Sequence, residues 1–406
     1  MEQLKHRRDQ VRLRLLGPDG APAADLPVKI DQISHQFLFG CGAFAAVPLT
    51  NTEDEAQRAF WEEQMGKWLQ LFNYGTLPFY WGRYEPTEGQ TAYSETMAAA
   101  RWLQAHGVRV KGHPLCWHTV CADWLMQYPT EEILRRQIER IHREVNAYRG
   151  VIDMWDVINE VVIMPVFDRY DNAITRVCRE TGRIRLVREV FQAAKETNPD
   201  ALLLINDFNV NEAYELLLEE LLEADVPIDA IGIQSHQHQG YWGREKLEDV
   251  LSRFSRFGLP LHFTENTLVS GDLMPGHIVD LNDWQVDSWP STPEGEARQA
   301  AEMEEMYSIL FAHPQVEAIT TWDFCDGGWL KAPSGFVRED NSEKPSYHML
   351  RKLIHGAWET HKTLRTDADG FLSFTGFKGG YTLRSEVGSA DFALIGEPPA
   401  QLHLSR

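Results

Sequence analysis

Between residues 37 and 322 the sequence repeats one pattern, a short apolar run followed by a longer amphipathic segment. Three of the longer segments, at 130–148, 185–197 and 296–311, have apolar residues three or four positions apart, which predicts helices, with Thr130 as an N-cap. The apolar runs are short enough for buried strands. They are 37–41, 71–76, 108–113, 151–160, 202–206, 228–234, 261–265 and 316–322. Eight strand–helix units predict an α/β fold, a (β/α)8 TIM barrel over residues 37–357.

The two ends of the chain have a different pattern. Residues 11–33 alternate apolar and polar positions around the turn sequence at 17–20, which predicts a β-hairpin within residues 1–36. Within residues 358–406, short strand-like runs are separated by glycine-containing turns. Because chain termini usually lie close together, we expect the N- and C-terminal segments to form one small β-sandwich domain.

The net charge of −21 over 406 residues argues against nucleic acid or an anionic membrane as a partner. The five cysteines are an odd number without a C-x-x-C pair, which favours reduced thiols and a cytoplasmic setting. Residues 1–10 are charged and show no signal peptide; a secreted protein is expected only if such a segment was trimmed away. The sequence gives no expectation for the oligomeric state.

Two glutamates follow apolar runs at the expected carboxyl-terminal side of the barrel, where such barrels carry their chemistry. Glu160 ends the fourth run and Glu265 ends the seventh. Two carboxyl groups that face each other cleave glycosidic bonds, and in the retaining mechanism they stand roughly 5–5.5 Å apart. One attacks the anomeric carbon, and the other protonates the leaving oxygen and later activates water. The two groups need different pKa values, which repulsion and different neighbours provide.

Six sequence blocks, in order, resemble those of glycoside hydrolase family 10, the xylanase family of (β/α)8 barrels. They are E-P-T-E-G (85–89), K-G-H-P-L-C-W-H (111–118), W-D-V-I-N-E (155–160), L-I-N-D-F-N (204–209), G-I-Q-S-H (232–236) and F-T-E (263–265). The resemblance covers roughly residues 37–357. It implies retaining cleavage of a β-glycosidic bond in xylan-derived or related oligosaccharides or glycosides, without a cofactor or a metal.

Position by position, the resemblance implies that Glu160 is the acid/base and Glu265 the nucleophile. His236 would form a hydrogen bond with the nucleophile, and Asn159 would contact the sugar 2-hydroxyl. The other candidate substrate-binding residues are His113 and Trp117 in the pocket, Gln234, the aromatic walls Trp322 and Trp329, and a new recognition patch that includes Tyr80 and Arg83.

The sequence departs from the family in the regions that bind xylan. The second strand of the family carries E-N-x-M-K-W, whereas this chain has Thr76 to Tyr80 before Trp81. Val120 replaces an expected glutamine, and the 322–329 segment is one residue short. Thr267 replaces an acidic residue, so His236 is expected to lack its acidic partner. The cleavage residues match the family, and the xylan-binding surface does not.

Two other classes of function are left open. The altered second strand and Thr267 are compatible with a non-catalytic, carbohydrate-binding barrel. His113, His118, His236 and His238 raise the alternative of a metal-dependent barrel hydrolase, but the chain has neither H-E-x-x-H nor an H-x-H on its first strand.

Overall fold

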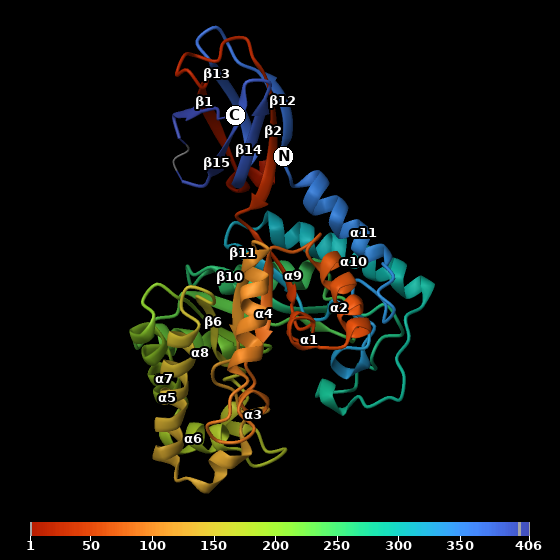
Figure 1. Cartoon of the computed structure of the whole chain (residues 1–406). Helices are drawn as coiled ribbons and strands as arrows, with labels where there is room; N and C mark the ends of the chain where they lie inside the picture. The colour runs from red at the N-terminus through yellow and green to blue at the C-terminus, as the bar shows by residue number, and fades with distance from the viewer. Residues whose placement is uncertain (1, 397–398, 406) are drawn as a thin grey trace. The chain divides into compact units, whose positions relative to one another are not determined.

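The computed structural model describes residues 2–396 and 399–405. The chain folds as two compact units. One comprises Met1–Leu38, Phe311–Pro314 and His348–Arg406, and the other comprises Phe39–Leu310 and Gln315–Tyr347. The first unit is built from strands, and the second carries a barrel (Figure 1).

Eight parallel strands form the closed barrel, because β11 pairs with both β3 and β10. The predicted (β/α)8 fold is therefore confirmed. A further two-residue strand, β9 (His236–Gln237), runs alongside the end of β10. The barrel strands are β3 (Leu38–Gly42), β4 (Tyr74–Pro78), β5 (Arg109–His113), β6 (Met154–Asn159), β7 (Leu202–Asp207), β8 (Ala230–Ile233), β10 (Leu261–Leu268) and β11 (Val316–Thr321).

The helices follow the strands as predicted, with one difference at the start of α5. Thr130 is the first residue of that helix and not its N-cap, which is Pro129. The first turn still carries Glu131 and Glu132, whose charges favour the helix dipole. The helices are α1 (Ala46–Asn51), α2 (Glu55–Trp68), α3 (Trp81–Tyr84), α4 (Tyr93–Ala105), α5 (Thr130–Ala147), α6 (Ala173–Thr181), α7 (Arg183–Thr197), α8 (Glu212–Glu223), α9 (Gly243–Ser255), α10 (Pro293–Ala312) and α11 (Pro345–Lys352). Short helical turns are η1 (Glu2–Arg7), η2 (Asp123–Gln127), η3 (Met164–Val166), η4 (Leu281–Asp283), η5 (Trp329–Lys331) and η6 (Leu353–Ala357).

The strand that ends at Asn159 is anchored by a large aromatic side chain. Trp155 of β6 is fully buried, and its ring meets the ring of Phe79 edge-on at 4.9 Å. Gly112 on the neighbouring β5 makes room for it, because a Cβ atom there would lie 2.1 Å from the Trp155 ring. Such tight packing leaves β6 little freedom to shift and fixes the position of the polar residues at its end.

The terminal segments form a β-sandwich, as predicted, but the expected N-terminal hairpin is wrong. β1 (Arg8–Leu16) lies in a sheet of order β13–β1–β16, and β2 (Pro27–His35) lies in a second sheet of order β12–β2–β14–β15. Residues 17–26 carry the chain from one sheet to the other, and the alternating apolar positions of both strands meet in a shared core. The remaining strands are β12 (His361–Arg365), β13 (Phe371–Phe377), β14 (Gly379–Ser385), β15 (Gly388–Leu394) and β16 (Gln401–His403).

Within the described ranges, no helix combines the length and the apolar character needed to cross a membrane. The five cysteines are free thiols.

Candidate active site

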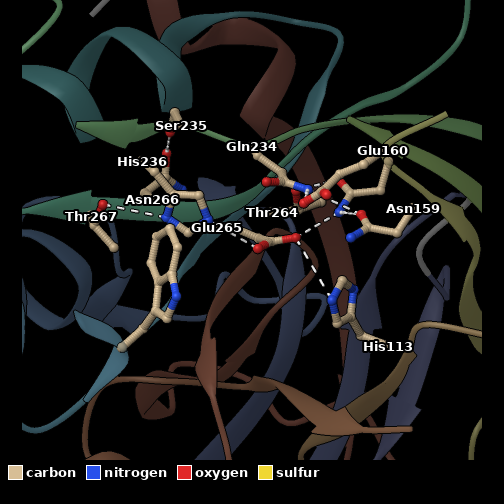
Figure 2. A network of polar contacts seen from close by, with 12 residues as sticks. His113, Asn159, Glu160, Gln234, Ser235, His236, Thr264, Glu265, Asn266 and Thr267 are labelled. Atoms are coloured by element: carbon tan, nitrogen blue, oxygen red, sulfur yellow. Dashed lines mark hydrogen bonds and ion pairs between the residues drawn. The ribbon is translucent and has the colours of Figure 1, made fainter. Parts of the chain in front are cut away.

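Glu160 directly follows β6, whereas Glu265 lies within β10, which continues to Leu268 and so does not end at Glu265 as the sequence predicts. Glu265 stands beyond Phe263, the last residue of β10 that pairs with β8. Glu160 has a φ of +57°, an uncommon backbone conformation for a residue other than glycine. Its N–H donates to the Asn206 carbonyl oxygen at 2.8 Å, which holds this turn against β7. The strained turn therefore directs the Glu160 side chain into the group of polar residues seen in Figure 2.

Glu265 is buried and both of its carboxylate oxygens are held. Asn206 Nδ2 donates to Oε1 at 2.7 Å, and His236 Nε2 forms a hydrogen bond with Oε2 at 3.1 Å. His113 Nε2 lies 3.9 Å from Oε1. Burial alone raises the pKa of Glu265, but the charge of His113, the bond and charge of His236 and the charge of Lys111 outweigh it and lower the pKa. Glu265 is therefore ionised at neutral pH.

A buried chain of charged groups stands behind His113. Lys111 Nζ lies 2.6 Å from Asp156 Oδ2, and the same oxygen lies 2.7 Å from His113 Nδ1. Burial raises the pKa of Asp156, but the Lys111 charge and the His113 hydrogen bond outweigh it and lower the pKa. Sequence reasoning missed Lys111 and Asp156 as site residues. The available signal was two ionisable side chains inside otherwise apolar strands, within the motif blocks.

Glu160 has the opposite electrostatic environment. Trp117 Nε1 donates to its Oε2 at 2.9 Å, and Gln234 Nε2 donates to its Oε1 at 3.3 Å. Burial and the charge of Glu265 raise the pKa of Glu160 to about 8, against the effect of the Trp117 hydrogen bond. The two carboxyl groups thus have pKa values moved in opposite directions, the pattern that separates an acid from a nucleophile.

Asn206 joins the two carboxyl groups, and sequence reasoning missed it as a site residue although it lies in a matching block. Its Nδ2 donates to Asn159 Oδ1 at 2.9 Å as well as to Glu265, and its Oδ1 accepts from Thr264 Oγ1 at 2.6 Å. Gln234 Nε2 also donates to Asn159 Oδ1, at 3.0 Å. One amide network therefore fixes Asn159, Glu160 and Glu265 (Figure 2).

His236 has a hydroxyl neighbour where the family has a carboxylate. Thr267 Oγ1 lies 3.5 Å from His236 Nδ1 and 3.3 Å from His238 Nδ1. The same oxygen accepts from the N–H of Gln237 at 3.1 Å. Thr267 therefore holds the end of β9 against β10 but supplies no negative charge to His236.

Four of the predicted aromatic residues surround the carboxyl groups. Trp322 lies 5.3 Å from the His113 ring and 6.1 Å from the His236 ring. Trp329 lies 4.6 Å from the His236 ring. The Tyr80 ring lies 5.8 Å from His113 and 5.7 Å from Trp117, so the structure brings these predicted residues together.

The altered second strand contributes one side chain to the site. Thr76, Leu77 and Phe79 are fully buried, and the Phe79 ring packs against Tyr148 and Trp155. The Tyr80 ring lies beside Trp117, whose Nε1 donates to Glu160. Burial and the charge of Glu265 raise the pKa of Tyr80 well above its usual value. Arg83 is exposed and its guanidinium lies 5.6 Å from the centre of the Tyr80 ring.

The histidines of the metal alternative do not form a ligand set. His118 is buried against Phe167, and burial lowers its pKa to about 4. Burial and the charge of His236 lower the pKa of His238 to about 3. In the part of the chain that the structure describes, no group of three His, Cys, Asp or Glu side chains could hold a metal ion.

The closed barrel and the two glutamates on the carboxyl-terminal side of its strands are the features of the (β/α)8 glycosidase class. The family model described as "Glycosyl hydrolase family 10" matches residues 78–353. The chain belongs to glycosyl hydrolase family 10, which confirms the resemblance seen in the sequence.

Individual relatives agree with this assignment. An "Endo-1,4-beta-xylanase/feruloyl esterase" of Xylanibacter ruminicola is 27% identical over 309 residues, covering 70% of this chain and 41% of that protein. The "Anti-sigma-I factor RsgI6" of Acetivibrio thermocellus is 22% identical over 392 residues, covering 94% of this chain and 45% of that protein. This chain thus spans less than half the length of either protein. The solved structure of a family 10 protein from Paenibacillus barcinonensis has a TM-score of 0.64 at 22% identity, over 79% of this chain and 96% of that chain, and supports the fold.

Proposed function

We propose that this chain is a retaining glycoside hydrolase that cleaves a β-glycosidic bond in xylan-derived or related oligosaccharides or glycosides. The observation that carries the proposal is the opposite pKa shift of two glutamates in one hydrogen-bond network. Glu265 is ionised and suited to attack, while Glu160 keeps its proton at neutral pH and is suited to donate it.

The first step follows from these protonation states. A Glu265 carboxylate oxygen attacks the anomeric carbon while Glu160 gives its proton to the departing oxygen. Asn206 and His236 hold the two Glu265 oxygens, so the attacking group is already oriented before the substrate arrives.

The second step uses the same pair in reversed roles. Once Glu265 is bonded to the sugar it carries no charge, and the repulsion that helps to raise the pKa of Glu160 is gone. The pKa of Glu160 then falls, and its carboxylate can take a proton from the water that releases the sugar.

Asn159 is suited to bind the sugar 2-hydroxyl. Its Oδ1 already accepts from Asn206 and from Gln234, and no hydrogen bond involves its Nδ2 within residues 2–396 and 399–405. The free N–H groups can donate to a hydroxyl, a contact that strengthens in the transition state. Trp117, Tyr80, Trp322 and Trp329 supply flat rings for the sugar faces.

The test is hydrolysis of aryl β-xylosides and β-glucosides with leaving groups of graded acidity. Glu265→Ala removes the nucleophile and is expected to abolish turnover of every substrate. Glu160→Ala is expected to lower kcat/KM for glycosides of poor leaving groups by about 100-fold or more and to spare kcat/KM for those of acidic phenols, which leave without a proton. For the acidic phenols kcat is still expected to fall, because the second step has lost its base. Glu139→Ala, on the exposed side of α5, is the matched control.

Two results would contradict the mechanism. Full activity of the Glu265→Ala or Glu160→Ala protein on poor leaving groups would remove that residue from the reaction. A first-formed product with inverted anomeric configuration, seen by NMR, would exclude retention.

A second candidate function is a non-catalytic carbohydrate-binding barrel. Thr267 in place of an acidic residue favours it, and so does the relative named as an anti-sigma-I factor, a name that does not describe an enzyme. This candidate predicts that xylo-oligosaccharides bind in calorimetry although no glycoside of the series is turned over.

A further inference from the structure

A second cavity, of about 630 Å³, opens in the barrel unit beside the carboxyl-terminal ends of β3 and β11. Its volume is typical of ligand sites. None of the predicted catalytic or substrate-binding residues lines it. It is lined by the end of β3 and the residues that follow it, by side chains of α2, by residues 287–290, by residues 323–328 and by Lys331, with Glu339 also in the lining.

The Trp322 indole and the His113 imidazole lie between this cavity and Glu265. The Trp322 ring contacts the ring of Phe44 edge-on, with 5.2 Å between the ring centres, and Phe44 lines the cavity. The Trp322 ring also contacts the His113 ring, at 5.3 Å. His113 in turn lies beside Glu265. The cavity therefore adjoins the residues that surround Glu265.

The cavity lining combines aromatic rings with carboxylates. Half-buried rings of Phe44, Phe60 and Trp61 and the buried rings of Trp289 and Phe324 contribute its apolar surface. Flat rings of this kind pack against the C–H faces of sugars, and carboxylate oxygens accept hydrogen bonds from sugar hydroxyls.

The charges of the lining are unbalanced toward the negative. Asp326 is paired with buried Lys344 at 2.8 Å, whereas Asp323 accepts only from Ser334 Oγ and the N–H of Trp329. Asp287 and Glu339 likewise form no ion pair within the described residues. The cation of the lining, Lys331, is exposed, and its Nζ donates to backbone oxygens.

Two consecutive glycines let the backbone approach these carboxylates closely. A Cβ atom on Gly328 would lie 2.2 Å from Asp323 Oδ1, and one on Gly327 would lie 2.9 Å from Glu339 Oε1. Gly327 also has a φ of +78°, which side-chain-bearing residues rarely adopt. The local sequence thus keeps both carboxylates at the cavity wall.

We propose that this cavity is a second saccharide site, which binds an uncharged sugar unit of the substrate and disfavours a uronic acid. The proposal rests on the glycoside hydrolase function proposed above. The rings hold the sugar faces, the carboxylates accept from its hydroxyls, and the uncompensated negative charge repels a uronate.

The first test removes a ring. Trp61→Ala is expected to lower kcat/KM for neutral branched and linear xylo-oligosaccharides by about tenfold, while kcat/KM for an aryl β-xyloside is unchanged. Trp102→Ala is the matched control, because Trp102 is also a half-buried helical tryptophan but lies on α4 and stacks on His106. If the Trp61→Ala protein handles oligosaccharides like the wild type, Trp61 binds no sugar and the proposal fails.

The second test isolates charge. A uronosyl-substituted xylo-oligosaccharide is compared with the same molecule after its carboxyl group has been reduced to an alcohol. The wild type is expected to prefer the reduced form by about fivefold in kcat/KM, and the double variant Asp287→Asn, Glu339→Gln is expected to lose this preference. Equal rates for both forms in the wild type would overturn the proposal.

The aryl β-xyloside distinguishes hydrolysis at the glutamates from sugar binding in the cavity. It needs a sugar only at the glutamates, so its turnover supports the proposed hydrolase whatever the cavity does. If the wild type turns over neither this substrate nor any other glycoside of the series, the hydrolase proposal fails. Calorimetric binding of the reduced and uronosyl oligosaccharides to the same variants then tests sugar binding in the cavity independently of hydrolysis.

Discussion

Replacing Asn206 with aspartate tests whether the network around the glutamates sets their protonation. The substitution keeps the shape of the side chain and changes one donor into an oxygen. In the structure that donor, Nδ2, lies 2.7 Å from Glu265 Oε1. Asn206→Asp therefore removes a hydrogen bond to the nucleophile and places a second carboxylate against it.

The contact distance gives the size of the effect. A hydrogen bond to a charged group contributes roughly 1.5–3 kcal/mol, which corresponds to about 10-fold to 150-fold in rate. Two unit charges at this distance of 2.7 Å repel by about 6 kcal/mol at an effective dielectric constant of about 20. The repulsion exceeds the lost bond, so the pair is expected to keep one proton and the ionisation of Glu265 to move to higher pH.

The assay is kcat/KM for an aryl β-xyloside between about pH 4 and pH 9. Asn206→Asp is expected to lower kcat/KM at neutral pH by about 100-fold or more and to move the acidic limb upward, whereas Asn206→Ala lowers the rate with less movement. Asn211→Asp is the control, since Asn211 caps α8 through its side chain and aspartate caps a helix equally well. An Asn206→Asp enzyme with the rate and acidic limb of the wild type would refute the assigned role of Asn206.

Three further outcomes follow from the same electrostatics. The proposed role of Glu160 requires its proton, so kcat/KM is expected to fall as the pH rises through about 8. Trp117→Phe removes the hydrogen-bond donor to ionised Glu160 and should move this alkaline limb of the pH profile to higher pH. An unmoved alkaline limb would count against the Trp117 contact. The raised folded-state pKa of Glu160 also affects stability, which is expected to decline as the pH rises from the unfolded pKa of this group to about 8. Glu160→Gln should therefore raise Tm near pH 8 and have little effect near pH 4. Equal shifts of Tm at both pH values would contradict this. Lys344→Met leaves Asp326 buried without its cation and should lower the free energy of unfolding in urea by roughly 3–5 kcal/mol, while no loss would mean that the ion pair does not stabilise the fold.

The barrel could be predicted because its strands are short apolar runs separated by helical segments, a signal local to each segment. The pairing of β1 and β2 could not, because alternation shows only that one face of a strand is buried. Leu13 and Val28 both point into the sandwich core, although their strands lie in different sheets. The glycine-containing turn at 17–20 looks like a hairpin turn, and only the pairing with C-terminal strands shows that it is part of a crossing.

Site residues could be predicted where they stand within a recognisable sequence motif. They were harder to predict where their role depends on contacts between strands. Glu160 and Glu265 stand at the ends of their apolar runs. The role of Asn206 depends on reaching Asn159 and Glu265 on neighbouring strands, which the local pattern does not contain. Likewise, nothing local shows that Leu77 is fully buried while the Tyr80 ring lies beside His113 and Trp117. The catalytic roles and the cytoplasmic setting stay predictions until they are tested.

Thr267 in place of an acidic residue favours a binding protein over an enzyme. The contacts of Glu265 make this support weaker. The lost acidic residue would matter for catalysis if the ionisation of Glu265 depended on it. The charges that lower the pKa of Glu265 come instead from His113, His236 and Lys111. His113 is held by Asp156, which lies on β6 and does not depend on position 267. Glu265 therefore keeps its charge with threonine at 267, so this departure from the family does not count against the proposed attack by Glu265.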